Sequence, residues 1–331
     1  MTSTHRYQHH AVRRDLKRAR ARLRESWKLQ HATEAELATI PLRVAEEQMP
    51  SAGSRPQVAV VDERGRPYLF KVAPTDQIAA ELLAARVRAL GKQLHVPVVR
   101  RSIEIAGAMS QLGMVQPRLE VLGELPKLPA DWTDLQCEAL LVEHPWEWLL
   151  ANLDTHIDQY VLVGEDRLPL NIDWDHSLVD LPTTELTRFN RRSATVIPVR
   201  NLLYADYVAG NAELDFYGMQ LQAHRIREIP FATLEELLER WADEAEVDTA
   251  RRRFVIETMR VRHDRIARDF DRFVAELRHE RKAVKGLPRA WSDRAASQVQ
   301  DAWQRFALLV LHDRVVRPVL SLRRKLASRY S

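Results

Sequence analysis

The sequence has little cysteine and no long hydrophobic run. Cys137 is the one cysteine among 331 residues, which excludes an intrachain disulfide and a cysteine zinc cluster. No stretch approaches roughly eighteen uninterrupted apolar residues, and the first thirty residues are polar and basic, unlike a signal peptide. A P-loop, G-x-x-x-x-G-K followed by Ser or Thr, is also absent. We therefore expect a cytoplasmic protein, with a peripheral position at a membrane as the alternative.

The small net charge of +4 conceals a segregation of charges along the chain. Residues 1–30 hold nine Lys and Arg against two acids (+7), and residues 251–331 hold twenty-one against nine (+12), which leaves −15 for the residues between. Basic ends of this kind either bind an anionic membrane or nucleic acid, or pack on the acidic middle of the chain. With 45% hydrophobic residues, the chain can build one large domain or two.

Residues 11–30 predict a basic amphipathic helix, because helix formers dominate and apolar residues recur at helical spacing. The apolar stripe consists of Val12, Leu16, Leu23 and Trp27. The arginines of this helix either contact nucleic acid or an anionic membrane, or stay in water while the stripe packs on the domain. Packing is the simpler interpretation, and an anionic surface is kept as a possible partner.

A hairpin and a lysine follow from residue 50. A loop of small residues over 51–54 precedes a strand at 58–61, a turn and a second strand at 68–72. Lys71 lies near the end of the second strand among apolar residues. A lysine so placed suits the neutralisation of nucleotide phosphates, although an ordinary surface lysine is the alternative.

A helix is predicted from Thr75, as its cap, to about Leu90, with Gly91 ending it. Glu81 lies two turns into this helix and is the natural partner of Lys71. The segment that follows reads as short strands at 96–99, 102–105 and 114–119, and residues 135–142 and 146–151 read as two helices. The tryptophans in and near these helices are expected in the core rather than at a binding surface.

Residues 152–175 carry most of the functional information. Asp154, His156 and Gln159 share a short loop, which a strand at 160–163, a turn and a second strand ending in Asp173 follow. Phosphoryl transfer needs a carboxylate that orients or deprotonates the acceptor hydroxyl, and further oxygen ligands for magnesium. A hairpin brings such groups close together.

These residues resemble an active site of a known family. Asn152-x-Asp154-x-His156-x-x-Gln159, with Ile172-Asp173 downstream, resembles the paired motifs of the atypical kinases, in the HipA-like and phosphatidylinositol 3-/4-kinase-like branch. The family pattern is N-x-D-R-H-x-x-N, followed by a hydrophobic residue and Asp. Thr155 here replaces the usual arginine, and Gln159 replaces the asparagine that binds magnesium.

The resemblance covers residues 51–180 and, more loosely, extends to 230. It implies an α+β, two-lobed kinase-like fold with a small antiparallel-sheet N-lobe, a mainly helical C-lobe and additional N- and C-terminal helices. The corresponding segments are 1–49, 50–120, 121–230 and 231–331. ATP and Mg²⁺ are the implied cofactors.

The resemblance also implies roles for individual residues. Asp154 is the expected catalytic base and His156 a scaffold of the loop. The expected metal ligands are Asp173 and Gln159, with Asp158 as a substitute and Asp175 as an additional ligand. The expected nucleotide-binding residues are Ser51, Gly53, Ser54, Lys71, Glu81 and, beside an adenine-binding hinge at 114–117, Gln116.

The remaining segments carry fewer signals. Residues 178–199 hold several Ser and Thr beside arginines and are either a substrate loop that phosphorylation orders or a solvated loop. Helices are predicted at 233–245, with Thr233 as the cap, at 247–285 and at 292–329. The basic cluster at 323–329 leaves the same two alternatives as the N-terminal helix.

Three functions remain. The leading one is a phosphotransferase that uses ATP and Mg²⁺ and acts on an unidentified hydroxyl, with protein Ser or Thr favoured over lipid or small molecule because of the HipA-like features between Ser51 and Lys71. The departures at Thr155 and Gln159 leave open a nucleotide-binding pseudokinase that acts as a scaffold. The third is a nucleic-acid or membrane-surface module.

Overall fold

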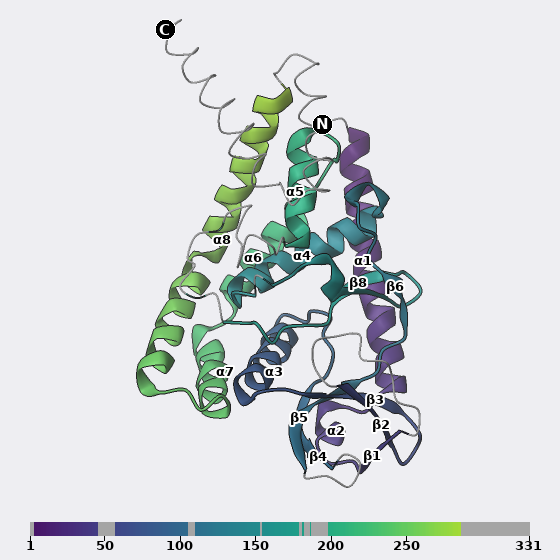
Figure 1. Cartoon of the computed structure of the whole chain (residues 1–331). Coiled ribbons are helices and arrows are strands. Elements are labelled where there is room, and N and C mark those ends of the chain that lie inside the picture. Colours follow the sequence, from purple (N-terminus) through teal and green to yellow (C-terminus); the bar gives the residue numbers. More distant parts are fainter. Residues whose placement is uncertain are drawn as a thin grey trace, which may run out of the picture.

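An antiparallel sheet forms one lobe of the protein, and helices form most of the other (Figure 1). The computed structural model describes residues 3–45, 57–104, 110–152, 154–178, 181, 186 and 198–285. The sheet contains β1 (Leu42–Val44), β2 (Gln57–Asp62), β3 (Pro67–Val72), β4 (Val99–Ile103) and β5 (Gln111–Pro117) in the order β1-β2-β3-β5-β4. The predicted α+β class, with an antiparallel-sheet lobe and a mainly helical lobe, is confirmed.

The hairpin of β2 and β3 sets the position of Lys71. Gly65 turns the chain with φ +75°, and the carboxylate of Asp62 accepts hydrogen bonds at 2.9 Å from the backbone N–H groups of Arg64 and Arg66. In the resulting register, Lys71 lies between Gln57 of β2 and Met114 of β5. The strand β1 lies in the segment predicted as a helical extension, so that segment also supplies an edge of the sheet.

Helix α3 (Thr75–Leu90) follows β3 directly and carries Glu81. The helix is nearly surrounded by protein, since most of its residues between Ile78 and Val87 are buried. It ends at Gly91 as predicted. The prediction that Thr75 caps it is wrong, because Pro74 occupies the N-cap position and no side chain caps the helix.

The helical lobe is built around α4 (Asp134–Leu149), which contacts α1, α5, α6 and α8. Its other elements are η1 (Pro129–Asp131), α5 (Val199–Ala209), α6 (Tyr217–Glu228), α7 (Phe231–Glu244) and α8 (Thr249–Lys285). A second sheet, in the order β6-β7-β8, consists of β6 (Val121–Glu124), β7 (Tyr160–Val163) and β8 (Leu168–Asn171), with η2 (Ile157–Gln159) before β7. The tryptophans of α4 are fully buried, which confirms their place in the core.

Several predicted elements differ from the structure. The two helices predicted at 135–142 and 146–151 are one helix, because α4 continues through Pro145 with buried packing on several sides. One strand, β4, replaces the two predicted at 96–99 and 102–105. Pro230 rather than Thr233 is the N-cap of α7. The helix predicted at 292–329 lies outside the described residues.

Helix α1 (Ser3–Gln30) runs alongside α4 and the β7–β8 hairpin, and α2 (Glu34–Leu37) lies near the sheet (Figure 1). The buried stripe of α1 consists of Leu16, Ala19 and Leu23. The packing predicted for this helix is therefore confirmed. Among the described residues, no helix is both long and apolar enough to cross a bilayer.

Candidate active site

Backbone hydrogen bonds join the loop after α4 to the segment after β8. The N–H of Ile172 donates to the carbonyl of Gln159 at 3.1 Å, and the N–H of Leu178 donates to the carbonyl of Leu150 at 2.7 Å. The side-chain amide of Asn152 donates to the carbonyl of Asp173 at 3.3 Å. Both halves of the sequence motif are thus held side by side, and the alternating pattern of β7 and β8 explains why.

Lys71 and Glu81 bring the first lobe to this segment. The ammonium of Lys71 donates to the carbonyl of Ile172 at 3.4 Å, and a carboxylate oxygen of Glu81 accepts from the backbone N–H of Trp174 at 2.7 Å. Both side chains are almost entirely buried. Lys71 and Glu81 therefore contact the residues immediately before and after Asp173.

The acids of this site repel one another. Burial raises the pKa of Glu81 to about 7, against the attraction of Lys71, and Asp175 raises it further. Burial, Asp175 and Glu81 raise the pKa of Asp173 to about 8, whereas Lys71 lowers it. Lys71 thus offsets the charges of Glu81 and Asp173 only in part, and a bound divalent cation would stabilise the charged forms of these acids.

Asp154 meets the same cluster through a histidine. The Nε2 atom of His176 lies 3.4 Å from a carboxylate oxygen of Asp154 and 3.6 Å from one of Asp175. The Asp154 side chain is 14% exposed, so it combines access to the surface with a fixed position. His176 is not among the site residues predicted from the sequence, because its place between two acids cannot be read from its position three residues after Asp173.

The other predicted loop residues divide between the interior and the surface. Gln159 is buried, and its side-chain oxygen has no hydrogen-bond partner within the described residues. The Asp158 side chain is 74% exposed and lies 3.6 Å from His156 Nδ1. Asp158 thus lies largely in water beside His156, and the backbone carbonyl of His156 accepts a hydrogen bond from the N–H of Gln159 at 3.1 Å.

A buried network of hydrogen bonds and one ion pair holds the loop that contains Thr155. The guanidinium of Arg200, at the start of α5, donates to the hydroxyl of Thr155 at 2.7 Å and forms an ion pair with Glu147 of α4. The hydroxyl of Tyr160 donates to the other oxygen of Glu147, and the N–H of Val199 donates to the carbonyl of Thr155 at 2.7 Å. Sequence reasoning missed Arg200, because nothing in the sequence pairs positions 155 and 200.

The remaining nucleotide-binding predictions are tested less directly. Ser51, Gly53 and Ser54 lie outside the described residues. Gln116 is buried near the end of β5, paired in register with Leu69 of β3, so the expected hinge lies at the point where the chain leaves the sheet. Most of the loop at 178–199 also lies outside the described part of the chain.

The donor set fits a magnesium ion in its chemistry. Mg²⁺ prefers carboxylate and amide oxygens together with water and phosphate oxygens, and Asp173, Asp175 and the unpartnered oxygen of Gln159 are groups of this kind. Within the described ranges, no three His, Cys, Asp or Glu side chains converge to hold a metal by themselves. An ion here would therefore depend on the glutamine or on the nucleotide for further ligands.

The solved structures that resemble this chain include two kinases. No protein-family model and no curated protein matches the sequence. Among solved structures, the chain is similar to the Helicobacter pylori proinflammatory kinase CtkA, with a TM-score of 0.48 and 10% identity over 73% of this chain and 98% of that one. It is also similar to the MAP kinase LmaMPK10 from Leishmania major, with a TM-score of 0.28 and 13% identity over 78% and 87% of the two chains. Similarities of this size do not indicate an activity or a substrate.

Proposed function

We propose that the protein is an ATP- and magnesium-dependent phosphotransferase that transfers the γ-phosphoryl group to a hydroxyl. The observation that carries this proposal is the convergence of Lys71, Glu81 and the acids at 154, 173 and 175, from segments up to about a hundred residues apart. Charged side chains are rarely buried together without a ligand or a mechanism that needs them. Protein Ser or Thr is favoured as the acceptor by the HipA-like features between Ser51 and Lys71.

Different residues of the proposed site bind the phosphates and the metal ion. Lys71 binds phosphate oxygens of the nucleotide, and Glu81 holds the segment around Trp174 in place beside it. Asp173 and Gln159 would hold the magnesium ion, with Asp175 as a further ligand. When bound, the ion would supply positive charge beside the phosphates.

Asp154 orients the acceptor hydroxyl and takes its proton as the new bond to the γ-phosphorus forms, while the bond from that phosphorus to the bridging oxygen breaks and ADP leaves. A carboxylate suits this task because the proton is lost late and positioning supplies most of the effect. The Nε2 atom of His176 lies 3.4 Å from a carboxylate oxygen of Asp154, where it can hold this carboxylate in position for the acceptor. We therefore add His176 to the site as a positioning residue.

The network around Arg200 accounts for one departure from the family pattern. Thr155 occupies the place of the usual arginine and is completely buried, and the cation beside it comes instead from α5. The guanidinium of Arg200 neutralises Glu147 and holds the hydroxyl of Thr155, and the N–H of Val199 beside it holds the backbone carbonyl of Thr155. The substitution at Thr155 is thus compatible with an ordered catalytic loop.

A pseudokinase is the second candidate, and the observation that favours it is the exposed position of Asp158. If Asp158 cannot replace the missing asparagine, Gln159 alone must complete the metal site. Such a protein would bind nucleotide without turning it over.

Turnover separates the two candidates. Release of labelled phosphate from γ-labelled ATP, and its transfer to protein, should each fall at least about 100-fold in Asp154→Ala and in Asp173→Ala. Asp173→Ala should also weaken magnesium-dependent ATP binding, whereas Asp154→Ala should not. Asp166→Ala, on the exposed turn of the same hairpin, is the matched control and should keep the activity.

Each outcome has a definite meaning. Binding without turnover in the wild-type protein would replace the enzyme by the pseudokinase. No ATP binding in the wild-type protein would refute both.

A further inference from the structure

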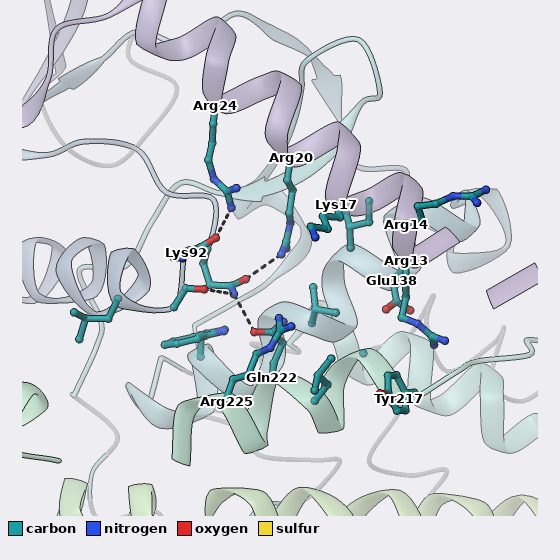
Figure 2. A pocket seen from close by; sticks show the side chains of 18 of the residues that line it. Arg13, Arg14, Lys17, Arg20, Arg24, Lys92, Glu138, Tyr217, Gln222 and Arg225 are labelled. Atoms are coloured by element: carbon teal, nitrogen blue, oxygen red, sulfur yellow. Dashed lines mark hydrogen bonds between the residues drawn. The ribbon is translucent and has the colours of Figure 1, made fainter. Parts of the chain in front are cut away.

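A cavity of about 850 Å³ lies between α1, the end of α3, α4 and α6 (Figure 2). Its volume is in the range of sites for small molecules, roughly 300–1,000 Å³. Lys71 and the acids of the candidate active site are not among its lining residues. The cavity is therefore a separate feature from the proposed catalytic site.

The cavity is lined by an excess of cations. Seven Lys and Arg line it, and Glu138 is the one acid among the lining residues. The cations are Arg13, Arg14, Lys17, Arg20, Arg24, Lys92 and Arg225. Such an imbalance in a concave site favours a ligand of opposite charge, because low-dielectric walls concentrate the field.

Helix α1 presents its cations as one row. Arg13, Lys17, Arg20 and Arg24 follow one another at intervals of four, three and four residues, which places them on one face of the helix beside the buried stripe. Figure 2 shows Lys17, Arg20 and Arg24 extending from α1 toward the wall that carries Lys92 and Gln222. Like charges at this spacing destabilise a helix, so an anion between them would relieve the repulsion.

The cations differ in whether they have acidic partners. Arg13 pairs with Asp215, and Arg20 lies 3.8 Å from Glu143. Lys17, Arg24, Lys92 and Arg225 have no acidic partner among the described residues. On the other side of α1, by contrast, Arg22 pairs with Asp166 across the chain at 2.8 Å. The cations without acidic partners thus lie along the cavity.

Hydrogen bonds preorganise the wall opposite α1. Gln93 is buried and accepts at 3.0 Å from Arg20, while its amide donates to the carbonyl of Gly91 at 3.1 Å and to Gln222 at 3.0 Å (Figure 2). Arg24 donates to the carbonyl of Lys92. Burial lowers the pKa of Arg20 to about 10, Glu143 opposes this, and Arg88 and Arg24 lower it further. A bound anion would reverse that effect.

We propose that this cavity binds a small molecule that carries two or more phosphate groups. Lys17, Lys92 and Arg225 contact the phosphates directly, and Arg20 and Arg24 contribute charge from positions that neighbouring groups hold. Apolar side chains, including Val142, Trp146 and Leu221, line the rest of the cavity and contact the body of the ligand. The phosphates belong either to a free molecule or to a lipid headgroup.

Calorimetric titration of the full chain with inorganic tripolyphosphate tests the proposal. The titrations use Lys71→Ala protein as well as wild type, so that binding in the proposed nucleotide site is recognised and subtracted. In both proteins we expect one tripolyphosphate site per chain that is separate from the proposed nucleotide site. Lys17→Ala combined with Arg225→Ala should weaken this site at least about tenfold.

A matched pair of substitutions controls for charge. Arg18→Ala combined with Arg227→Ala removes the same two charges from the same two helices, at exposed positions that do not line the cavity. This variant should bind tripolyphosphate within about threefold of the wild-type affinity. Equal weakening of tripolyphosphate binding in both double variants would mean diffuse electrostatic attraction and would overturn the proposal. The proposal would also be overturned if the Lys71→Ala protein bound no tripolyphosphate and the protein did not bind the vesicles described below.

Vesicles distinguish the two sources of phosphate. Phosphatidylcholine vesicles that contain phosphatidylinositol bisphosphate are compared with vesicles of equal charge that contain phosphatidylglycerol. Sedimentation with the first kind alone, lost in Lys17→Ala/Arg225→Ala, would assign the site to a lipid headgroup. Tripolyphosphate binding without sedimentation would assign it to a free molecule.

Discussion

The proposed active site and the basic cavity have opposite imbalances of charge. In the first, the acids at positions 81, 173 and 175 outnumber Lys71, and burial with mutual repulsion raises the pKa of Asp173. In the second, seven cations and one acid, Glu138, line the cavity, and burial with repulsion from other arginines lowers the pKa of Arg20. The same physical effect thus appears with opposite sign, and each region suits a different ligand, a metal–nucleotide complex in one case and a polyanion in the other.

Helix α4 links the two regions while keeping them separate. Glu138, Val142 and Trp146 line the cavity, whereas Glu147 contacts Arg200 and Tyr160 next to the proposed catalytic loop. Single substitutions should therefore damage one region and spare the other.

The largest effect is expected for Arg200→Ala. This change leaves the carboxylate of Glu147 buried without its cation, and the free energy of unfolding should fall by about 3–5 kcal/mol. Urea unfolding measures this loss. Phosphoryl transfer should be lost as well, while tripolyphosphate should still bind to the fraction that remains folded.

A paired substitution serves as the control for Arg200. Arg200→Leu combined with Glu147→Leu removes both charges and should cost less stability than Arg200→Ala. A loss below about 1 kcal/mol in Arg200→Ala would mean that the network does not hold the loop.

An intermediate effect is expected for Glu138→Gln, on the side of the cavity. Burial raises the pKa of Glu138 to about 7 from 4.5, while Arg13 lowers it and Asp215 raises it. Because the folded protein binds this proton more tightly, Glu138 contributes stability below pH 4.5 that is lost as the pH rises to about 7. Between pH 4.5 and pH 8, the free energy of unfolding of Glu138→Gln should therefore rise by about 2–3 kcal/mol relative to that of the wild type. Urea unfolding at each pH measures this difference.

The same substitution should also act on the ligand. At pH 8, Glu138→Gln removes the one carboxylate in the lining and should tighten tripolyphosphate binding. Glu25→Gln, at an exposed position on α1, is the control and should show the same difference from wild type at every pH. A stability difference for Glu138→Gln that does not change with pH would contradict the burial of its charge.

The smallest effect is expected at the start of α4. Thr133 caps this helix and forms a capping box with Gln136, so Thr133→Ala should reduce the free energy of unfolding by about 1 kcal/mol. Both regions should keep their ligands, because neither depends on the first turn of the helix. Loss of ATP binding in this variant would show that α4 does not separate the two regions.

Local patterns in the sequence predicted the parts of the fold that they determine. Alternating residues before Gly164 predict β7 with its observed limits, and Gly91 predicts the end of α3. The break expected between residues 142 and 146 does not occur, although Pro145 lies there. Loss of one backbone hydrogen bond is offset there by the packing of α4 against several helices.

The candidate site was predictable only where its residues lie in the hairpin or on neighbouring elements. Lys71 and Glu81 follow from a strand and the helix after it. Arg200 and His176 did not, since their roles depend on which segments meet in space. The row of cations on α1 was visible in the sequence, but the wall that makes it a cavity comes from residues 90–93 and α6.

Magnesium dependence of ATP binding tests the central claim most directly. Calorimetric titration with ATP should show that Mg²⁺ raises the affinity of the wild-type protein at least about tenfold, and that Asp173→Asn, which keeps the shape of the side chain, abolishes the increase. ATP that binds the wild-type protein equally well with and without Mg²⁺, or an increase that survives in Asp173→Asn, would contradict the assignment of Asp173.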